Sequence, residues 1–219
     1  ISLAHRGVLF MDEVVEFPRQ VLEILRQPLE DGEVTISRAM ISVKYPADFT
    51  LLAAMNPCPC GYFGDKLKAC SCSEFQAKKY WARLSGPILD RIDLQIEVSR
   101  LSEDELLNKN SNSESSKTIR ERVVRARKIQ VERFKEEGLV SNSQISPKHI
   151  KKYCQLDSNG ENLLRMAISK FNLSGRAYDR ILKLSRTIAD LKESENITQV
   201  HIAEAIQYRN FDRMMPAAV

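Results

Sequence analysis

The hydrophobic residues follow different patterns in the two parts of the chain. Up to about residue 107 they form short runs, of which 8–11 is continuously apolar and 49–55 is apolar except for Thr50. Such runs are typical of strands buried on both faces of a parallel sheet. From residue 117 on, apolar residues recur with a helical period, and the intervening segment 108–116 is polar. The pattern predicts a partial α/β core over 1–107, a linker over 108–116 and an all-helical domain over 117–219.

Local signals divide these parts further. In the first part we expect a helix from Pro18 that ends near Pro28 and Gly32, and a helix over 74–84 capped by Ser73. We also expect a hairpin with Arg38 at its tip and, from the alternation of apolar and polar residues, a strand over 92–98. In the second part the predicted helices cover 117–137 (capped by Ser116), 147–156, 160–171, 174–191 and 199–209, the last capped by Thr198.

Polar residues follow both apolar runs. Asp12 and Glu13 come directly after residues 8–11, and Asn56 comes directly after residues 49–55. Paired acids after a buried strand are typical of a Walker B site, in which Asp12 would hold Mg²⁺ and Glu13 would polarise the attacking water. Asn56 would orient that water or sense the γ-phosphate. The alternatives are an acidic turn and an Asn-Pro turn, both of which are common.

Four of the five cysteines fall within fifteen residues. Cys58, Cys60, Cys70 and Cys72 form a C-x-C-x₉-C-x-C pattern. Four thiolates complete a tetrahedral shell, so the pattern predicts a structural Zn²⁺ site with no position open for catalysis. Reduced thiols without metal and disulfides are the alternatives. Cys154 stands apart in a helical run, where we expect a buried apolar residue.

Charge is distributed unevenly over the 219 residues. Residues 1–110 hold 13 Lys and Arg against 16 Asp and Glu, a net −3, whereas residues 111–219 hold 20 against 13, a net +7. The basic half fits either a nucleic acid partner or a solvated helical surface. No apolar run approaches the roughly 20 residues that span a bilayer, so we expect a cytoplasmic protein without a membrane partner.

Several longer motifs resemble a known family. Residues 4–13, 28–32, 53–61, 84–93 and 174–183 are similar to AAA+ ATPases of the magnesium-chelatase-like branch, and most similar to its ComM/YifB type. The resemblance implies an α/β AAA+ core followed by a helical lid. It also implies a Walker B pair at Asp12 and Glu13, sensor 1 at Asn56, the arginine finger at Arg91 and sensor 2 at Arg176.

Two further points concern single arginines. Arg38 matches the place where related helicases carry a basic hairpin residue that faces DNA in the ring pore. For Arg91 the alternative to a finger is a surface salt bridge with Asp90 or Asp93.

One expected motif does not occur. The phosphate-binding sequence G-x-x-x-x-G-K-[ST] is missing from the chain. In the resembling family it precedes Walker B, so we expect it upstream of Ile1 in a longer protein. The chain alone should then bind ATP weakly or not at all, and its sheet should show an edge or patch that self-association could cover.

These expectations lead to three competing functions. The first is a ring-forming homo-hexamer that uses ATP and Mg²⁺ to act on DNA. The second is the motor subunit of a metal chelatase, acting on a protein partner. The third takes the chain in isolation as a zinc-braced helical interaction module.

Overall fold

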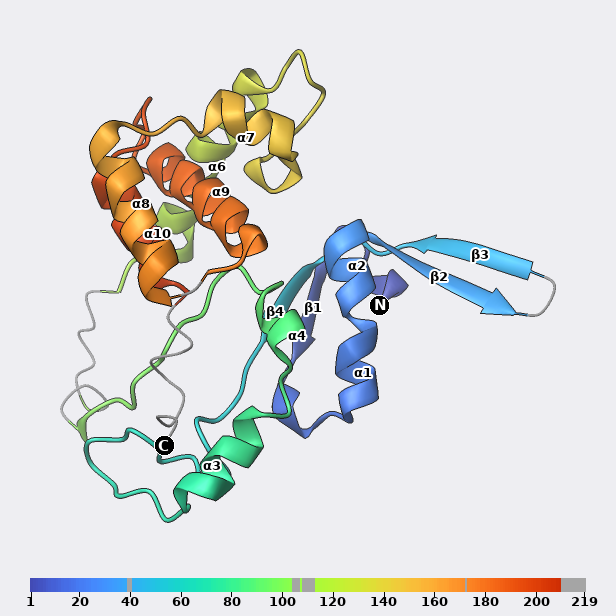
Figure 1. The fold of residues 1–219 in the computed structure, drawn as a ribbon, viewed down its shortest axis with the longest axis vertical. Helices are drawn as coiled ribbons and strands as arrows, with labels where there is room; N and C mark the ends of the chain where they lie inside the picture. Colours follow the sequence, from blue (N-terminus) through green and yellow to red (C-terminus); the bar gives the residue numbers. More distant parts are fainter. Residues whose placement is uncertain (39–40, 104–106, 108–112, 172, 210–219) are drawn as a thin grey trace. The chain divides into compact units, whose positions relative to one another are not determined.

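The computed structural model describes residues 1–38, 41–103, 107, 113–171 and 173–209, which divide into two compact units (Figure 1). The first unit extends to Ile92 and the second begins at Asp93. The first contains η1 (Ser2–Ala4), β1 (Val8–Met11), η2 (Val14–Glu16), α1 (Arg19–Ile24), α2 (Arg26–Asp31), β2 (Glu33–Arg38), β3 (Ile41–Pro46), β4 (Thr50–Ala53), α3 (Glu74–Trp81) and α4 (Gly86–Leu89).

Both predicted core strands form, and they pair in parallel. Val8 lies opposite Thr50 and Met11 opposite Ala53, so β1 and β4 are in register over their full length. The expectation that both sheet faces are buried is wrong for the described residues. Met11 packs into the core, but Val8 and Phe10 are 62% and 58% exposed. Alternate residues of a strand point to opposite faces, and only one face of this two-stranded sheet is covered by described elements.

The covered face packs against the helices that follow each strand. Buried apolar residues from η2, α1, α3 and α4 form this core, among them Val15, Leu22, Leu25, Tyr80, Trp81, Leu84 and Ile88. The predicted helix from Pro18 is broken at Leu25 and continues through Pro28 as α2. Pro28 was expected to end the helix; instead its ring would clash with the Ile24 carbonyl, which explains the break. Gly32 ends α2 as expected, with φ at 68°.

The predicted hairpin is confirmed. β2 and β3 pair antiparallel from Glu33 opposite Pro46 to Arg38 opposite Ile41, and every residue of β3 is exposed. Figure 1 shows the two strands extending away from α2. Residues 39–40 lie outside the described residues, as does the side chain of Arg38.

The predicted strand over 92–98 does not form. These residues have no regular secondary structure, and Leu94, Ile96 and Val98 are exposed. The Gln95 N–H donates to the Tyr208 carbonyl, 2.8 Å away, instead of joining a strand ladder. Alternation alone cannot make a strand when no strand edge lies beside it to accept the backbone hydrogen bonds.

The second unit is helical, as predicted. It contains α6 (Ser116–Arg133), η3 (Asn142–Gln144), α7 (Pro147–Tyr153), α8 (Ser158–Phe171), α9 (Gly175–Leu191) and α10 (Gln199–Gln207). The cap of α6 is Ser115 rather than Ser116, because the Ser115 hydroxyl accepts from the Thr118 N–H at 3.2 Å. α6 also ends earlier than expected, since Phe134 turns into the core.

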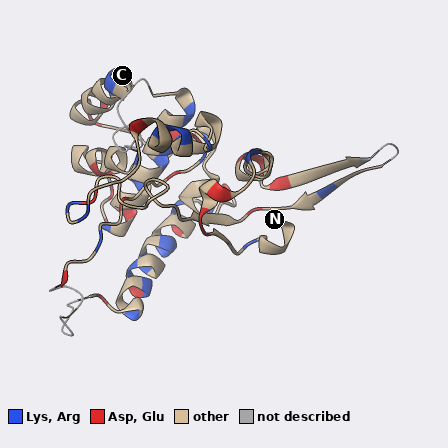
Figure 2. Cartoon of the chain, turned by 90° about the horizontal axis from the view of Figure 1, so that it is seen from below, with Lys and Arg blue, Asp and Glu red and all other residues tan. Residues whose placement is uncertain are grey.

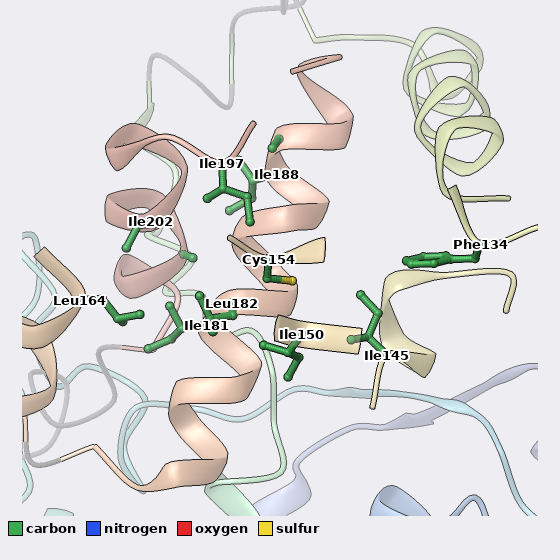
Figure 3. Packing of buried hydrophobic residues seen from close by; sticks show 12 residues of the cluster. Phe134, Ile145, Ile150, Cys154, Leu164, Ile181, Leu182, Ile188, Ile197 and Ile202 are labelled. Atoms are coloured by element: carbon green, nitrogen blue, oxygen red, sulfur yellow. The ribbon is translucent and has the colours of Figure 1, made fainter. Parts of the chain in front are cut away.

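Figure 3 shows the core of this unit, to which α7, α8, α9 and α10 each contribute a labelled residue. Phe134, Ile181, Leu182 and Ile202 are almost completely buried. Cys154 lies among them, which confirms its predicted apolar role, and burial raises the pKa of its thiol to about 11. None of the described helices is both long and apolar enough to cross a membrane.

A buried ionic network joins α6 to α9. The Asp190 carboxylate is fully buried and accepts from Arg133 at 2.8 and 2.5 Å and from Arg186 at 3.0 Å. The Asn142 amide donates to it at 2.8 Å. Arg186 also donates to the carbonyls of Glu195 and Ser194. With its partners hydrogen-bonded in this way, the charge of Asp190 can remain inside the helical unit.

Candidate functional site

The two predicted acids lie where β1 ends. Asp12 and Glu13 are both exposed, whereas Met11 before them and Val14 after them are buried. Glu13 has the left-handed backbone conformation, with φ at 48° and ψ at 45°, and its N–H donates to the Asp12 carboxylate at 2.9 Å. This conformation is uncommon for a residue with a side chain and is found disproportionately at functional sites. The turn leaves two carboxylates at the strand end, open to solvent.

Hydrogen bonds hold this turn to the end of β4. The Ala54 N–H donates to the Met11 carbonyl at 2.9 Å, and the Val14 N–H donates to the Ala54 carbonyl at 2.9 Å. The carboxyl ends of the two parallel strands therefore form one edge, which is the edge where open α/β sheets bind ligands. Asn56 is exposed and follows two residues after Ala54 on this edge.

Helix α3 fixes the segments that follow both strands. The Trp81 indole N–H donates to the Pro57 carbonyl at 2.7 Å, next to Asn56. Arg83, just beyond α3, donates to the Val15 carbonyl at 3.3 Å and to the Glu16 carboxylate at 2.7 Å. Sequence reasoning missed these anchors, although the only tryptophan of the chain signalled a packed helix.

Tyr80 lies between the same two segments. Its pKa is raised, first by burial and second by the charge of Glu16, with a smaller contribution from the charge of Glu13. A hydrogen bond with the Asn56 backbone opposes this shift. Tyr80 therefore contacts the segment after β4 and also senses the acids that follow β1.

The exposed carboxylates suit a hydrated divalent cation. Mg²⁺ keeps several of its waters and is usually bound through one or two carboxylates together with substrate phosphates. Asp12 can supply such a ligand, and Glu13 lies beside it as a base for water. The structure brings Asp12, Glu13 and the segment of Asn56 to one edge, and the roles assigned to the three side chains remain predictions.

The four clustered cysteines come together in space. Their Sγ atoms all lie within 4.8 Å of one another. Cys58 lies 3.3 Å from Cys60 and 3.6 Å from Cys70, and Cys60 lies 3.4 Å from Cys70. Zn–S bonds of about 2.3 Å in a tetrahedron place sulfurs roughly 3.8 Å apart, so this donor set fits Zn²⁺ closely. The cluster could hold a metal and would brace the loop between β4 and α3.

The local electrostatics shift the pKa values of these thiols in opposite directions. A hydrogen bond from the Tyr62 backbone is the main cause that lowers the pKa of Cys60 to about 5. The Cys72 N–H lowers the pKa of Cys70, but burial and the neighbouring thiols outweigh it and raise the pKa to about 12. The metal ligand is the thiolate, so the lowered pKa favours metal binding at Cys60 and the raised pKa opposes it at Cys70.

Arg91 is not at an exposed edge. It is only 7% exposed, and its guanidinium donates to the Pro87 carbonyl at 2.7 Å and pairs with the Glu30 carboxylate. Glu30 is about 40% exposed and lines, with Arg91 and Glu23, an open hollow on the first unit. The finger role of Arg91 therefore requires a change of partner, and the alternative of an exposed surface salt bridge does not describe it.

The other two arginines with predicted roles, Arg38 and Arg176, are distant in sequence from Asp12, Glu13 and Asn56. Arg38 is the last residue of β2, and its side chain lies outside the described residues. Arg176 is exposed in the first turn of α9, in the second unit. The Ser174 hydroxyl caps this turn by accepting from the Ala177 N–H at 3.2 Å.

Two protein-family models match the chain in sequence order. The model for magnesium chelatase, subunit ChlI, matches residues 1–106, and the model for the C-terminal part of the same subunit matches residues 113–209. The chain belongs to the magnesium chelatase ChlI family. The predicted family is thus confirmed, and the α/β first unit and helical second unit are consistent with an AAA+ core and its lid.

Within this family the chain is similar to bacterial relatives over nearly its whole length. It is 47% identical over 215 residues to competence protein ComM of Haemophilus influenzae and 42% identical over 216 residues to YifB of Escherichia coli. Each match covers 98% of the chain but 41% of the relative. The magnesium-chelatase subunit ChlI of Pyropia yezoensis is 37% identical over 57 residues, which are 26% of the chain and 16% of that protein.

Proposed function

We propose that this chain is the part of a ring-forming, homo-hexameric AAA+ ATPase that activates water for ATP hydrolysis. The observation that carries the proposal is the solvent-exposed pair Asp12 and Glu13 at the same sheet edge as Asn56. Asp12 would hold Mg²⁺ on the nucleotide, Glu13 would take the proton of the attacking water, and Asn56 would orient that water. Arg91 and Arg176 would complete the site from a neighbouring subunit and from the lid.

Substitution of Glu13 tests this proposal. In a protein of the length of the relatives, Glu13→Gln removes the base but keeps the side-chain size. General base catalysis contributes about 10²–10⁴-fold, so kcat should fall by at least about 10²-fold with little change in KM. Glu16→Gln is the matched control, because Glu16 is also exposed, lies three residues away and pairs with Arg83. Equal activity of Glu13→Gln and Glu16→Gln would refute the catalytic assignment.

We further propose that the motor acts on DNA, in the manner expected for recombination or transformation. The similarity to a competence protein supports this, as does the projecting β2–β3 hairpin that carries Arg38. One cationic residue per subunit, repeated around a ring, can grip a phosphate backbone without reading sequence. Branched DNA should stimulate the ATPase, and Arg38→Ala should reduce that stimulation. If neither DNA nor Arg38→Ala changes the rate, the DNA motor is wrong.

The second candidate is a chelatase-type motor that acts on a protein partner. The two ChlI family matches favour it, since they cover both units of the chain. The Cys₄ cluster, with a structural Zn²⁺, would brace the core in either case. An ATPase that DNA leaves unchanged, but that a metal-inserting partner protein stimulates, would support this candidate over the first.

A further inference from the structure

The solvent-facing side of α6 is strongly basic. Lys117, Arg120, Arg127 and Lys128 are exposed. Arg120, Arg127 and Lys128 follow Lys117 by three, ten and eleven residues, which places all four along one side of the helix. Figure 2 shows the blue of Lys and Arg repeating along α6, the long helix at lower left, with the red of Asp and Glu between them. The exposed Glu121 lies on the same side of the helix. The opposite side holds the buried residues Ala126 and Gln130. We call the four cations the basic face.

The basic face lacks ion-pair partners among the described residues, whereas other cations of α6 are paired. Arg122 pairs with Glu114 at 3.0 Å, Arg125 pairs with Glu193 at 2.9 Å, and Arg133 pairs with the buried Asp190. No described carboxylate lies within ion-pair distance of the four cations of the basic face. Their field therefore acts on whatever approaches from solvent.

The shape of the basic face suits a polyphosphate. α6 spans 18 residues, and at 1.5 Å per residue Lys117 and Lys128 are separated by roughly 16 Å along the axis. Duplex DNA presents one charge per roughly 1.7 Å of its axis, so several phosphates fall within that length. The network of Arg133 and Asp190 fixes the helix to α9, so the cations are held on a rigid support.

A membrane surface fits less well. Interfacial helices bury a broad face of large apolar residues such as Trp, Phe and Leu in the lipid boundary. Among the cations of the basic face the only exposed apolar residues are Val124 and Val131. The face also carries no aromatic residue on which a base could stack, so base-specific reading has no support here.

We propose that the basic face of α6 binds the phosphate backbone of nucleic acid without regard to sequence. This inference deepens the proposed DNA function and rests on it for the identity of the polyanion. It adds a contact in the helical unit that is separate in the chain from Arg38 on the hairpin. Its test needs neither ATP nor hydrolysis, so it can succeed or fail independently of the motor.

The test compares two variants that lose the same charge. In the basic-face variant, Lys117, Arg120, Arg127 and Lys128 are all changed to Gln, which keeps a high helix propensity. In the control variant the exposed residues Lys148, Lys151, Arg165 and Lys170 of the same unit are changed to Gln. Binding of a fluorescein-labelled duplex of arbitrary sequence is measured by anisotropy as a function of salt, and folding is checked by circular dichroism.

The expected result is specific to the face. Each phosphate contact contributes a slope of about −0.9 to log K against log salt. The basic-face variant should lose up to about 3.6 units of slope and at least about tenfold in affinity at 0.1 M salt, whereas the control variant should lose little of either. Two labelled duplexes of unrelated sequence should be affected equally.

Three results would overturn the proposal. The first is an equal loss in both variants, which would indicate net charge rather than a face. The second is an unchanged slope in a folded basic-face variant. The third is tighter binding of the unsubstituted chain to polyglutamate or to phosphatidylserine vesicles than to the duplex at the same salt, which would assign the basic face to an acidic protein or a membrane.

Discussion

The buried carboxylate of Asp190 is the feature whose removal should change the stability of the helical unit most. Asp190→Asn keeps the side-chain volume but removes the charge that compensates Arg186, which is 3% exposed. Removing one partner of a buried ion pair costs about 3–5 kcal/mol. Arg186 keeps its bonds to the Glu195 and Ser194 carbonyls, and Arg133 is near enough to the surface to regain water, so the lower end applies. We expect about 3 kcal/mol.

Two optical signals distinguish the units in a urea titration. Trp81, the only tryptophan, reports on the first unit, whereas circular dichroism is dominated by the helices of the second. With a urea dependence of about 1–3 kcal/mol per molar, a loss of 3 kcal/mol moves the circular dichroism midpoint by about 1–3 M. The Trp81 fluorescence midpoint should stay in place.

A surface pair provides the control for this titration. Arg125 and Glu193 form an ion pair in which both side chains are more than half exposed. Glu193→Gln should therefore shift the midpoint by an amount equivalent to less than about 1 kcal/mol. If Asp190→Asn shifted the circular dichroism midpoint no further than Glu193→Gln, the argument that the buried network stabilises this unit would be refuted.

Three further predictions concern metal, nucleotide and pH. Purified without chelators, the chain should contain about one zinc by elemental analysis. The Cys72→Ser variant should lose the zinc and show a lower melting temperature by Trp81 fluorescence, whereas the Cys154→Ser control should keep the zinc. An unsubstituted chain without metal would contradict the predicted site. Calorimetry of the chain with MgATP should detect no micromolar binding, and a micromolar Kd would show that the phosphates are held without the missing motif. Hydrogen bonds, first from Lys152 and then from Tyr153, lower the pKa of the Glu137 carboxyl to about 2. The ionised carboxylate should therefore contribute fully to stability above the unfolded-state pKa of about 4.3. This contribution should be lost as the pH falls through 2. Glu137→Gln should flatten stability against pH in that window, and an unchanged profile would contradict this assignment.

Local patterns were sufficient to predict most elements. The apolar runs at β1 and β4, the hairpin signals and the Ser73 cap of α3 each depend on neighbouring residues in the chain, so sequence reasoning located them, whereas it placed the cap of α6 one residue late. The predicted strand over 92–98 failed for the opposite reason. Its alternation is real, but strand formation depends on a partner edge, and Gln95 finds the Tyr208 carbonyl instead.

Side-chain partners that are distant in sequence were predictable only where the residue type itself indicates the partner. Closely spaced cysteines are typical of metal sites, so the four cysteines could be grouped from their spacing alone. In the structure their sulfur atoms lie close together. A carboxylate gives no such sign of its partner. Nothing near Arg91 in the sequence points to Glu30, and nothing near Asp190 points to Arg133, because the fold alone brings these pairs together.

The position of Arg91 sets a condition on its predicted role. An arginine finger has to reach phosphate in a neighbouring subunit, so its guanidinium must leave the group that holds it in its own subunit. Here the guanidinium is 7% exposed while its partner Glu30 is about 40% exposed beside an open hollow. Replacing the carboxylate with a phosphate keeps the cation paired, whereas moving Arg91 without a new anion would break its pair with Glu30 and form no other. Arg91 therefore has to exchange its pair with Glu30 for the contact with phosphate. A subunit interface that places a nucleotide phosphate beside Arg91 would favour this exchange.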